Sequence, residues 1–435
     1  MDLIVGVAQR PRIRKITVAI IAAFVSFLAY SSVYAYRKPF TIAEFDGLKY
    51  WGITYQTLLI ISQVIGYMLS KLAGIKFISE LKLSGRFKTA IALVGTGWAC
   101  LLIFAIVPAP YGMLFLFING FVLGFLWGIV FSYVEGRTTT DFIGAVLAVS
   151  FIFAGGFTRS VAKWLIVEWG VTEYWMPFMT GLIFALPLLC FLSILEKLPP
   201  PDDEDNRERR VRVPMDWQGR KKLLKNFGTG LYVCSVSYLF LTVMRDIRDN
   251  YMSNIWTELG YGNDYSIFAR TETITSLSIL LIMALTVMIR KNIRALLLLH
   301  FIIATGLLIA GLSSMLFITG YLSGMAWMQL VSLGLYMGYI PFNSIFFERL
   351  IASFRIAGNV GFLIYFADAF GYLGSVLVML GKEFYPMEVS WSGFYSKGVI
   401  GAALIGLTAI AFSYSYFQKK YRWQQGQQLL SERES

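Results

Sequence analysis

The sequence has little of what a soluble enzyme needs. Only 15% of its 435 residues are charged and 57% are hydrophobic, whereas soluble domains carry roughly 25% charged residues. This balance excludes a soluble globular protein. The chain has one histidine and three cysteines, and Cys100, Cys190 and Cys234 lie inside apolar stretches without paired spacing. The sequence therefore predicts neither a disulfide framework nor a metal site, and we expect no cofactor.

Apolar runs long enough to cross a membrane as helices dominate the chain. They fall into two groups of six, separated by the polar, proline-led segment PPPDDEDNRERR. The first and seventh helices are expected to continue past their apolar cores into charged turns. The predicted runs are 16–35, 54–72, 90–107, 113–134, 142–167 and 175–195 in the first group, and 228–244, 271–289, 295–317, 327–347, 356–380 and 399–416 in the second.

These runs predict an all-α polytopic membrane protein with 12 transmembrane helices in two six-helix bundles. The predicted division is an N-terminal bundle (1–195), a cytoplasmic linker (196–225), a C-terminal bundle (226–418) and a cytoplasmic tail (419–435).

Basic residues determine the predicted orientation. With the N-terminus inside, 27 of the 38 Lys and Arg residues fall in cytoplasmic segments, whereas the outer loops hold only Lys49, Lys382 and Lys397. The positive-inside rule then places both termini and the linker in the cytoplasm, as expected for a bacterial inner-membrane protein. This bias accounts for the net charge of +12, so no nucleic-acid partner is expected. The expected partners are a small anionic solute and membrane lipids, bound by a monomer.

An internal repeat supports the six-plus-six division. The segments VEGRTTTDFIGAVLAV, from Val134, and FERLIASFRIAGNVGF, from Phe347, share the order acid, base, polar turn and glycine. Arg37 and Arg245 are separated by 208 residues, close to the offset of these segments. Near-constant offsets indicate a duplicated unit, as in transporters whose two pseudo-symmetric halves surround a central site.

Eight basic residues that remain are assigned to the predicted helices and their charged extensions, where a charged side chain is costly and usually functional. They are Arg37, Lys38, Lys71, Arg159, Lys163, Arg245, Arg248 and Arg270. Arg37 and Lys38 follow the first apolar run in the segment YAYRKPF. They could extend to the outer interface, or they could form an anion clamp, because the arginine fork can bind two oxygens of one phosphate. Lys71, in the second helix, could likewise extend to the inner surface or line a cavity.

The segment MRDIRDNYMSNIW, in the seventh helix, places both signs of charge on one side of a helix. Arg245 is spaced i,i+4 from Asp249 and i,i+3 from Arg248, and Asp246 is spaced i,i+3 from Asp249. The segment could be a self-neutralised salt-bridge cluster. It could also be a gate, in which an arginine binds the solute and neighbouring acids hold that arginine when the solute is absent.

Other isolated polar residues are candidates for gating or coupling. Arg159 and Lys163 are spaced i,i+4 and share a face of the fifth predicted helix. Arg270 and Glu272, in the eighth, are too close in sequence to face each other, so each needs a partner from elsewhere in the chain. Asp368 is the only acid in the eleventh predicted helix, so it could be a proton site or the partner of a cavity arginine. His300, the single histidine, is interpreted as structural.

Several short motifs resemble the organophosphate:phosphate antiporters of the major facilitator superfamily. One is the first-helix pattern YxxRKxF, with Arg37 and Lys38, and another is Tyr-x-x-Ser-Lys, ending at Lys71. Arg245 matches the family's seventh-helix arginine. The remaining similar positions, in the tenth and eleventh helices, are Tyr339, Pro341, Glu348, Gly358, Gly371, Tyr372, Leu373 and Gly374.

The resemblance implies a major facilitator fold and a secondary transporter of a small anionic, phosphorylated solute. It implies that Arg37, Lys38, Lys71 and Arg245 bind the solute. Two alternatives remain open: a membrane sensor that keeps this fold, and a proton-coupled transporter of another organic anion. An enzyme is not expected, because the only acidic cluster, residues 202–205, lies in the polar linker.

Overall fold

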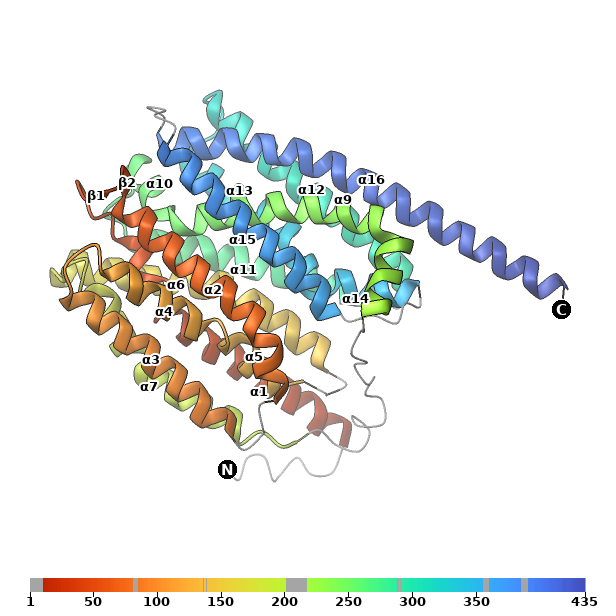
Figure 1. The fold of residues 1–435 in the computed structure, drawn as a ribbon, viewed down its shortest axis with the longest axis horizontal. Helices are drawn as coiled ribbons and strands as arrows, with labels where there is room; N and C mark the ends of the chain where they lie inside the picture. Colours follow the sequence, from red (N-terminus) through yellow and green to blue (C-terminus); the bar gives the residue numbers. More distant parts are fainter. Residues whose placement is uncertain are drawn as a thin grey trace. The chain divides into compact units, whose positions relative to one another are not determined.

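The computed structural model describes residues 11–80, 85–135, 137, 139–200, 217–287, 289, 291–354, 360–384 and 390–434. These residues form long helices, with one two-residue strand pair among them (Figure 1). The chain divides into two compact units. Unit 1 comprises Met1–Arg210, Asn250–Leu280 and Met379–Pro386, and unit 2 comprises Val211–Asp249, Leu281–Val378 and Met387–Ser435.

Unit 1 contains the helices of the first sequence repeat and short segments from the second. Its elements are α1 (Pro11–Tyr34), η2 (Pro39–Ile42), β1 (Lys49–Tyr50), β2 (Ile53–Thr54), α2 (Tyr55–Glu80), α3 (Arg86–Ile106), α4 (Gly112–Leu123), α5 (Leu126–Ser132), α6 (Thr140–Trp169), α7 (Met176–Glu196), α10 (Met252–Glu258) and most of α11 (Ser266–Val287).

Helix pairs in unit 1 pack closely, and α3 lies beside α7 (Figure 1). Helices α2 and α4 approach each other closely, since a Cβ atom on Gly66 would lie 2.1 Å from the Phe117 carbonyl oxygen. The absence of a side chain at Gly66 therefore allows α2 to pack closely against α4.

Unit 2 contains the rest of the second repeat. Its helices are α9 (Trp217–Asn250), α12 (Asn292–Ile318), α13 (Gly324–Ser344), α14 (Phe346–Ser353), α15 (Val360–Phe384) and α16 (Trp391–Glu434). The last residue of α9 and the end of α15 belong to unit 1. Helix α12 packs against α13, α14 and α16, and mutual glycine contacts bring α12 and α13 together, since a Cβ on Gly306 would lie 2.4 Å from the Gly334 carbonyl oxygen.

The predicted membrane helices are present. Among the described residues, ten helices are long and apolar enough to cross a membrane, and the pair α13 and α14, bent by 49°, makes an eleventh. Helix α15, of 25 residues, occupies the remaining predicted run. The all-α polytopic fold class is therefore confirmed.

Several predicted boundaries differ from the structure. Helix α1 ends at Tyr34 instead of continuing, because Pro39 begins a separate 3-10 turn. The prediction for the seventh helix is right, since α9 runs to Asn250. Helix α9 also begins within the predicted linker, and α16 continues through the predicted tail. The acidic part of the linker lies outside the described residues, and the four-part division of the chain stays a prediction.

Candidate functional site

Arg37 and Lys38 lie inside unit 1, in the turn that follows α1. Their exposed fractions are 7% and 6%, so they do not extend into solvent or lipid. Two buried amides from other helices hold this turn. Gln63 donates to the Arg37 carbonyl oxygen at 2.8 Å, and Asn119 donates to the Tyr36 carbonyl oxygen at 3.0 Å. Buried backbone carbonyls need such donors where a helix stops, so the turn presents both cations to the protein interior.

Tyr67 of α2 brings two of the predicted cations together. The Arg37 guanidinium carbon lies 3.5 Å from the centre of the Tyr67 ring, and the Lys71 ammonium lies 5.2 Å from the same ring. Lys71 is also 5.9 Å from the Trp127 ring. Cation–π contacts of this kind position cations without neutralising them. The first- and second-helix motifs therefore converge on one cationic, aromatic cluster.

Lys38 contacts a segment of the second repeat within unit 1. Its ammonium donates a hydrogen bond of 2.7 Å to the side-chain oxygen of Asn250, the last residue of α9. Asn254, four residues further on in α10, exchanges amide hydrogen bonds of 3.0 and 3.2 Å with Gln56. These contacts join residues of both repeats into a polar network inside unit 1.

Glu383, at the end of α15, extends this network. It accepts hydrogen bonds from the Thr54 hydroxyl at 2.6 Å, from the Thr54 backbone N–H at 3.2 Å and from the Thr57 hydroxyl at 2.7 Å. Thr57 also shares a hydrogen bond of 2.7 Å with the Tyr251 hydroxyl. We call Thr54, Thr57, Tyr251 and Glu383 the Glu383 latch. Nothing in the sequence links Glu383 to Thr54, since they are 329 residues apart.

Arg159 and Glu272, two predicted gating residues, lie in α6 and α11 of unit 1. Arg159 is buried and donates to the Thr41 hydroxyl at 3.1 Å and to the Gly155 carbonyl oxygen at 3.0 Å. Glu272 packs on the α6 backbone, because a Cβ atom on Gly156 would lie 2.5 Å from the Glu272 Cβ. Arg159 therefore contacts η2 and its own helix, and Glu272 packs on the same helix near Gly156.

A group of carboxylates lies outside the membrane-spanning helices. Glu44 and Asp46 lie between η2 and β1, and Glu173 lies between α6 and α7. Glu173 accepts hydrogen bonds from the Glu44 and Phe45 backbone N–H groups at 2.9 and 3.1 Å. Burial raises the pKa of Glu44 above its ordinary value, and the Asp46 and Glu173 carboxylates raise it further, whereas Lys163 opposes them. This group therefore holds a proton more strongly than an exposed glutamate.

Arg245 is the corresponding buried arginine of unit 2. It is 7% exposed and lies over the Tyr339 ring, with its guanidinium carbon 4.3 Å from the ring centre. Its predicted pairing with Asp249 is confirmed, although the contact of 3.4 Å is long. Its Nε and Nη2 atoms have no hydrogen-bond partner among the described residues. The guanidinium therefore has donor capacity that these residues do not satisfy.

Asp249 is held from several directions. The Tyr336 hydroxyl donates to its two carboxylate oxygens at 3.0 and 3.2 Å, and the Arg248 guanidinium lies 3.6 Å away. The carboxylate can therefore remain in place if Arg245 moves to another anion. This arrangement suits the gate interpretation of the seventh helix better than a simple self-neutralised pair.

Asp368 of α15 is 2% exposed and accepts a hydrogen bond from the Tyr238 hydroxyl. Asn343 donates to the same hydroxyl oxygen at 2.6 Å, and Tyr238 stacks on Tyr339 with ring centres 5.4 Å apart. Tyr238, Tyr336 and Asn343 are not among the site residues predicted from the sequence. A usable signal exists for α13, where residues 336, 339 and 343 repeat at helical spacing and share one face.

Two further predicted residues behave differently from each other. Arg270, assigned to a predicted helix, is exposed. His300 is 2% exposed, and both of its ring nitrogens lie within hydrogen-bonding distance of groups in unit 2. This agrees with a structural role.

No cluster of three or more potential metal ligands occurs among the described residues. The pairing of Arg37 with Arg245 stays a prediction, because they belong to different units.

Comparison with known proteins gives a family and a fold. The family described as "Family of unknown function (DUF5690)" matches residues 39–420, whereas no curated protein matches the sequence. A mutant of the nucleoside transporter NupG has a similar structure, with 16% identity, a TM-score of 0.60, and coverage of 91% of this chain and 99% of that one. The D-xylose-proton symporter is also similar, with 14% identity, a TM-score of 0.60, and coverage of 92% and 97%. The chain therefore has the major facilitator fold.

Proposed function

The chain belongs to the family of unknown function DUF5690, and we propose that it is a secondary transporter of a small anionic solute. Transport takes place by alternating access across the inner membrane of a bacterium. The major facilitator fold supports this proposal, since the similar solved structures are named as transporters. The choice of an anion comes from the buried arginines.

The unsatisfied guanidinium of Arg245 is the observation that carries the proposal. A buried charge is costly unless it is paired and hydrogen-bonded, and Asp249 meets only part of this need, at 3.4 Å. A phosphate or carboxylate could accept hydrogen bonds from Nε and Nη2 in the bidentate geometry that arginine favours. In this proposal, Arg245 leaves Asp249 and binds the anion. The Tyr336 hydroxyl continues to hold the Asp249 carboxylate.

Arg37, Lys38 and Lys71 supply the proposed contacts in unit 1. Arg37 and Lys71 both lie beside the Tyr67 ring, at 3.5 and 5.2 Å from its centre. Lys38 donates to the neutral Asn250, a bond that an anion could replace. Three cations in one region favour a ligand with more than one negative charge, and a phosphate monoester is such a ligand.

We further propose that the solute is phosphorylated and that it is exchanged for inorganic phosphate. The support is the resemblance of the Arg37, Lys71 and Arg245 motifs to the organophosphate:phosphate antiporters. A second candidate function is proton-coupled transport of another organic anion. Asp368, buried beside Tyr238, supports it, because an intramembrane carboxylate can carry a proton.

The test is uptake into liposomes that contain the purified full-length chain. The liposomes are loaded with inorganic phosphate, and labelled phosphate esters, carboxylates, a nucleoside and D-xylose are offered outside. Uptake of a phosphate ester that depends on internal phosphate supports the proposal. Uptake of only the neutral nucleoside or sugar contradicts it. Saturable anion binding without uptake under any gradient would instead indicate a sensor that keeps the transporter fold.

A further inference from the structure

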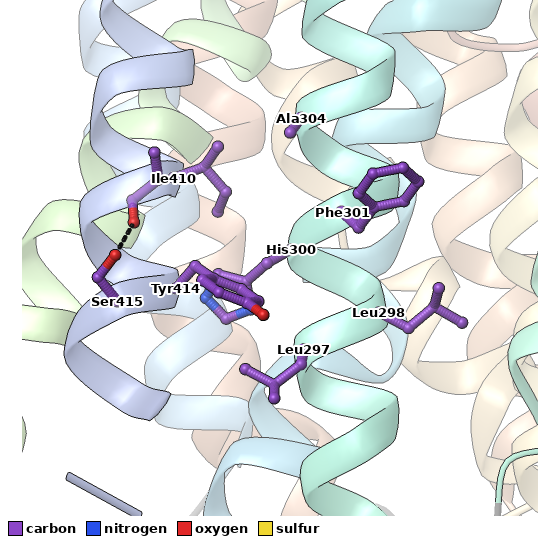
Figure 2. Close-up of a pocket in the computed structure, with 9 residues that line it drawn as sticks. Leu297, Leu298, His300, Phe301, Ala304, Ile410, Tyr414 and Ser415 are labelled. Atoms are coloured by element: carbon purple, nitrogen blue, oxygen red, sulfur yellow. Dashed lines mark hydrogen bonds between the residues drawn. The ribbon is translucent and has the colours of Figure 1, made fainter. Parts of the chain in front are cut away.

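A groove of about 490 Å³ lies between α12 and α16 of unit 2 (Figure 2). Leu297, Phe301 and Ala304 line it from α12, and Ala411 and Tyr414 line it from α16. Phe301 is 68% exposed, so the groove opens at the surface of the helix pair. Both helices belong to the set that is apolar enough to cross a membrane, which makes lipid the surrounding medium of this surface.

The floor of the groove is apolar although a histidine forms part of it. His300 is 2% exposed, its Nδ1 lies 2.8 Å from the Leu296 carbonyl oxygen, and its Nε2 lies 3.0 Å from the Ser413 hydroxyl. Because both nitrogens are engaged, the ring offers mainly carbon to the groove. Its ring centre lies 6.0 Å from that of Tyr414. An apolar chain therefore fits this floor better than an ion does.

Small residues create the groove without separating the helices. Further along the pair, α12 and α16 touch closely, since a Cβ atom on Gly406 would lie 3.0 Å from Leu307. Ala304 and Ala411 line the groove itself, and their short side chains leave the space open. A groove lined by Phe301, Tyr414 and these alanines therefore offers an apolar surface to an acyl chain.

Cations lie one helical turn beyond the groove on both helices. Arg294 precedes Leu298 by four residues on α12, and Lys419 follows Ser415 by four residues on α16, and both are exposed. Neither Asn292–Ile318 nor Trp391–Gln427 contains an acidic residue. Arg294 and Phe301 are about 10 Å apart along the helix axis. The groove therefore has an apolar body and a cationic end.

This end also has the features of a membrane interface. The positive-inside rule places the start of α12 and the end of α16 on the cytoplasmic side. Trp423, one turn beyond Lys419, is 62% exposed, and exposed tryptophans are typical of the level of the lipid headgroups. Basic pockets between membrane helices on this side bind the headgroups of anionic lipids.

We propose that the groove binds one anionic phospholipid of the cytoplasmic leaflet. An acyl chain lies between Phe301 and Tyr414, and the phosphate group lies between Arg294 and Lys419. The occupant comes from the bilayer, because the cations are reached from the headgroup layer and the groove from the hydrocarbon layer. The site is distinct from the proposed solute contacts at Arg245.

Native mass spectrometry of the full chain in detergent tests this proposal. Phosphatidylglycerol or the zwitterionic phosphatidylcholine is added, and the number and affinity of bound lipids are measured. We expect one phosphatidylglycerol to bind more tightly than the rest. Removing both cations in Arg294→Gln/Lys419→Gln should weaken this one binding event about 30-fold, on the basis of roughly 1 kcal/mol for each basic residue near the lipid surface.

Two further variants separate a built site from general attraction. Ala411→Phe fills the groove and keeps both cations, so it should also remove the tight binding event. Lys88→Gln/Lys197→Gln changes two exposed lysines of unit 1 and should leave it unchanged. Equal weakening in this control, or equal binding of both lipids by the unaltered chain, would overturn the proposal. Unchanged binding in Ala411→Phe would do so as well, since the groove would then hold no chain.

Discussion

Tyr238 donates a hydrogen bond to Asp368, a residue 130 positions away in the sequence, in the interior of unit 2. The Tyr238 oxygen in turn accepts a hydrogen bond from Asn343 at 2.6 Å. This network therefore joins α9, α13 and α15 and fixes the position of the Asp368 oxygen that accepts from Tyr238.

The first prediction concerns coupling. In liposomes without internal counter-substrate, we expect an imposed pH gradient to drive no accumulation of the solute. Asp368→Asn keeps an acceptor oxygen for Tyr238 and should slow exchange less than Asp368→Ala does. Strong accumulation in the unaltered protein that disappears in Asp368→Asn would show instead that Asp368 is a proton site.

The second prediction concerns the arginines. Arg37→Lys and Arg245→Lys should each lower the rate of anion exchange at least about tenfold, because charge-assisted hydrogen bonds contribute about 1.5–3 kcal/mol and an ammonium cannot form the two-pronged contact. The measurement is initial exchange rate at equal protein content. Lys225→Gln, at an exposed lysine, is the control and should leave the rate unchanged. Near-normal exchange in both arginine variants would exclude bidentate recognition.

The fold could be predicted from the sequence because membrane helices are determined locally. An apolar run of sufficient length must form a helix to satisfy its own backbone in lipid, so each predicted run has a helix in the structure. Helix ends were less predictable. Polar segments outside the lipid can also be helical, as Trp217–Lys225 is at the start of α9, and hydropathy carries no signal for them.

The candidate site was predictable only in part, because contacts between distant segments leave no local signal in the sequence. Arg37, Arg245 and Asp368 stand out because a charge in an apolar run is unusual. Their partners do not stand out, since Tyr67 and Tyr238 resemble any other aromatic residue of a membrane helix. The contact between Glu383 and Thr54 depends on how segments of the two repeats meet within unit 1, which one sequence does not reveal.

The third prediction concerns the Glu383 latch. Glu383→Gln removes the charge that accepts hydrogen bonds from Thr54 and Thr57. The contact between the end of α15 and these threonines should therefore break more often and expose the neighbouring residues of unit 1. In a variant without native cysteines, Ser253→Cys reports opening, since Ser253 is 2% exposed and bonded to the Ile42 carbonyl oxygen. We expect Glu383→Gln to raise its rate of modification by a water-soluble thiol reagent about threefold or more, as loss of about 0.7 kcal/mol would give.

Glu168→Gln provides the matched control for the latch, because Glu168 is an exposed glutamate of unit 1. It should leave the modification rate of Ser253→Cys unchanged. A rate that is also unchanged in Glu383→Gln would mean that the latch contributes nothing to closure.

The last prediction concerns pH and Glu44, whose pKa is raised above the ordinary value of 4.5, first by burial and then by Asp46. A raised pKa means that the folded state favours the protonated form. The stabilisation is therefore complete below the ordinary pKa and is lost as pH rises through the folded-state pKa. Glu44→Gln mimics the protonated side chain at every pH. We expect the Tm of the unaltered protein to fall, relative to that of Glu44→Gln, as pH rises above 4.5.

Thermal unfolding in detergent between pH 4 and pH 8 measures this difference. Asp46→Asn removes one of the charges that raise the pKa, so it should move the fall in Tm to lower pH without abolishing it. Glu168→Gln should follow the unaltered protein throughout. If Glu44→Gln and the unaltered protein keep the same difference in Tm at every pH, Glu44 titrates alike in the folded and unfolded states. The carboxylates of Asp46 and Glu173 would then have no influence on it, and the cluster would act only through its hydrogen bonds to the Glu44 and Phe45 backbone.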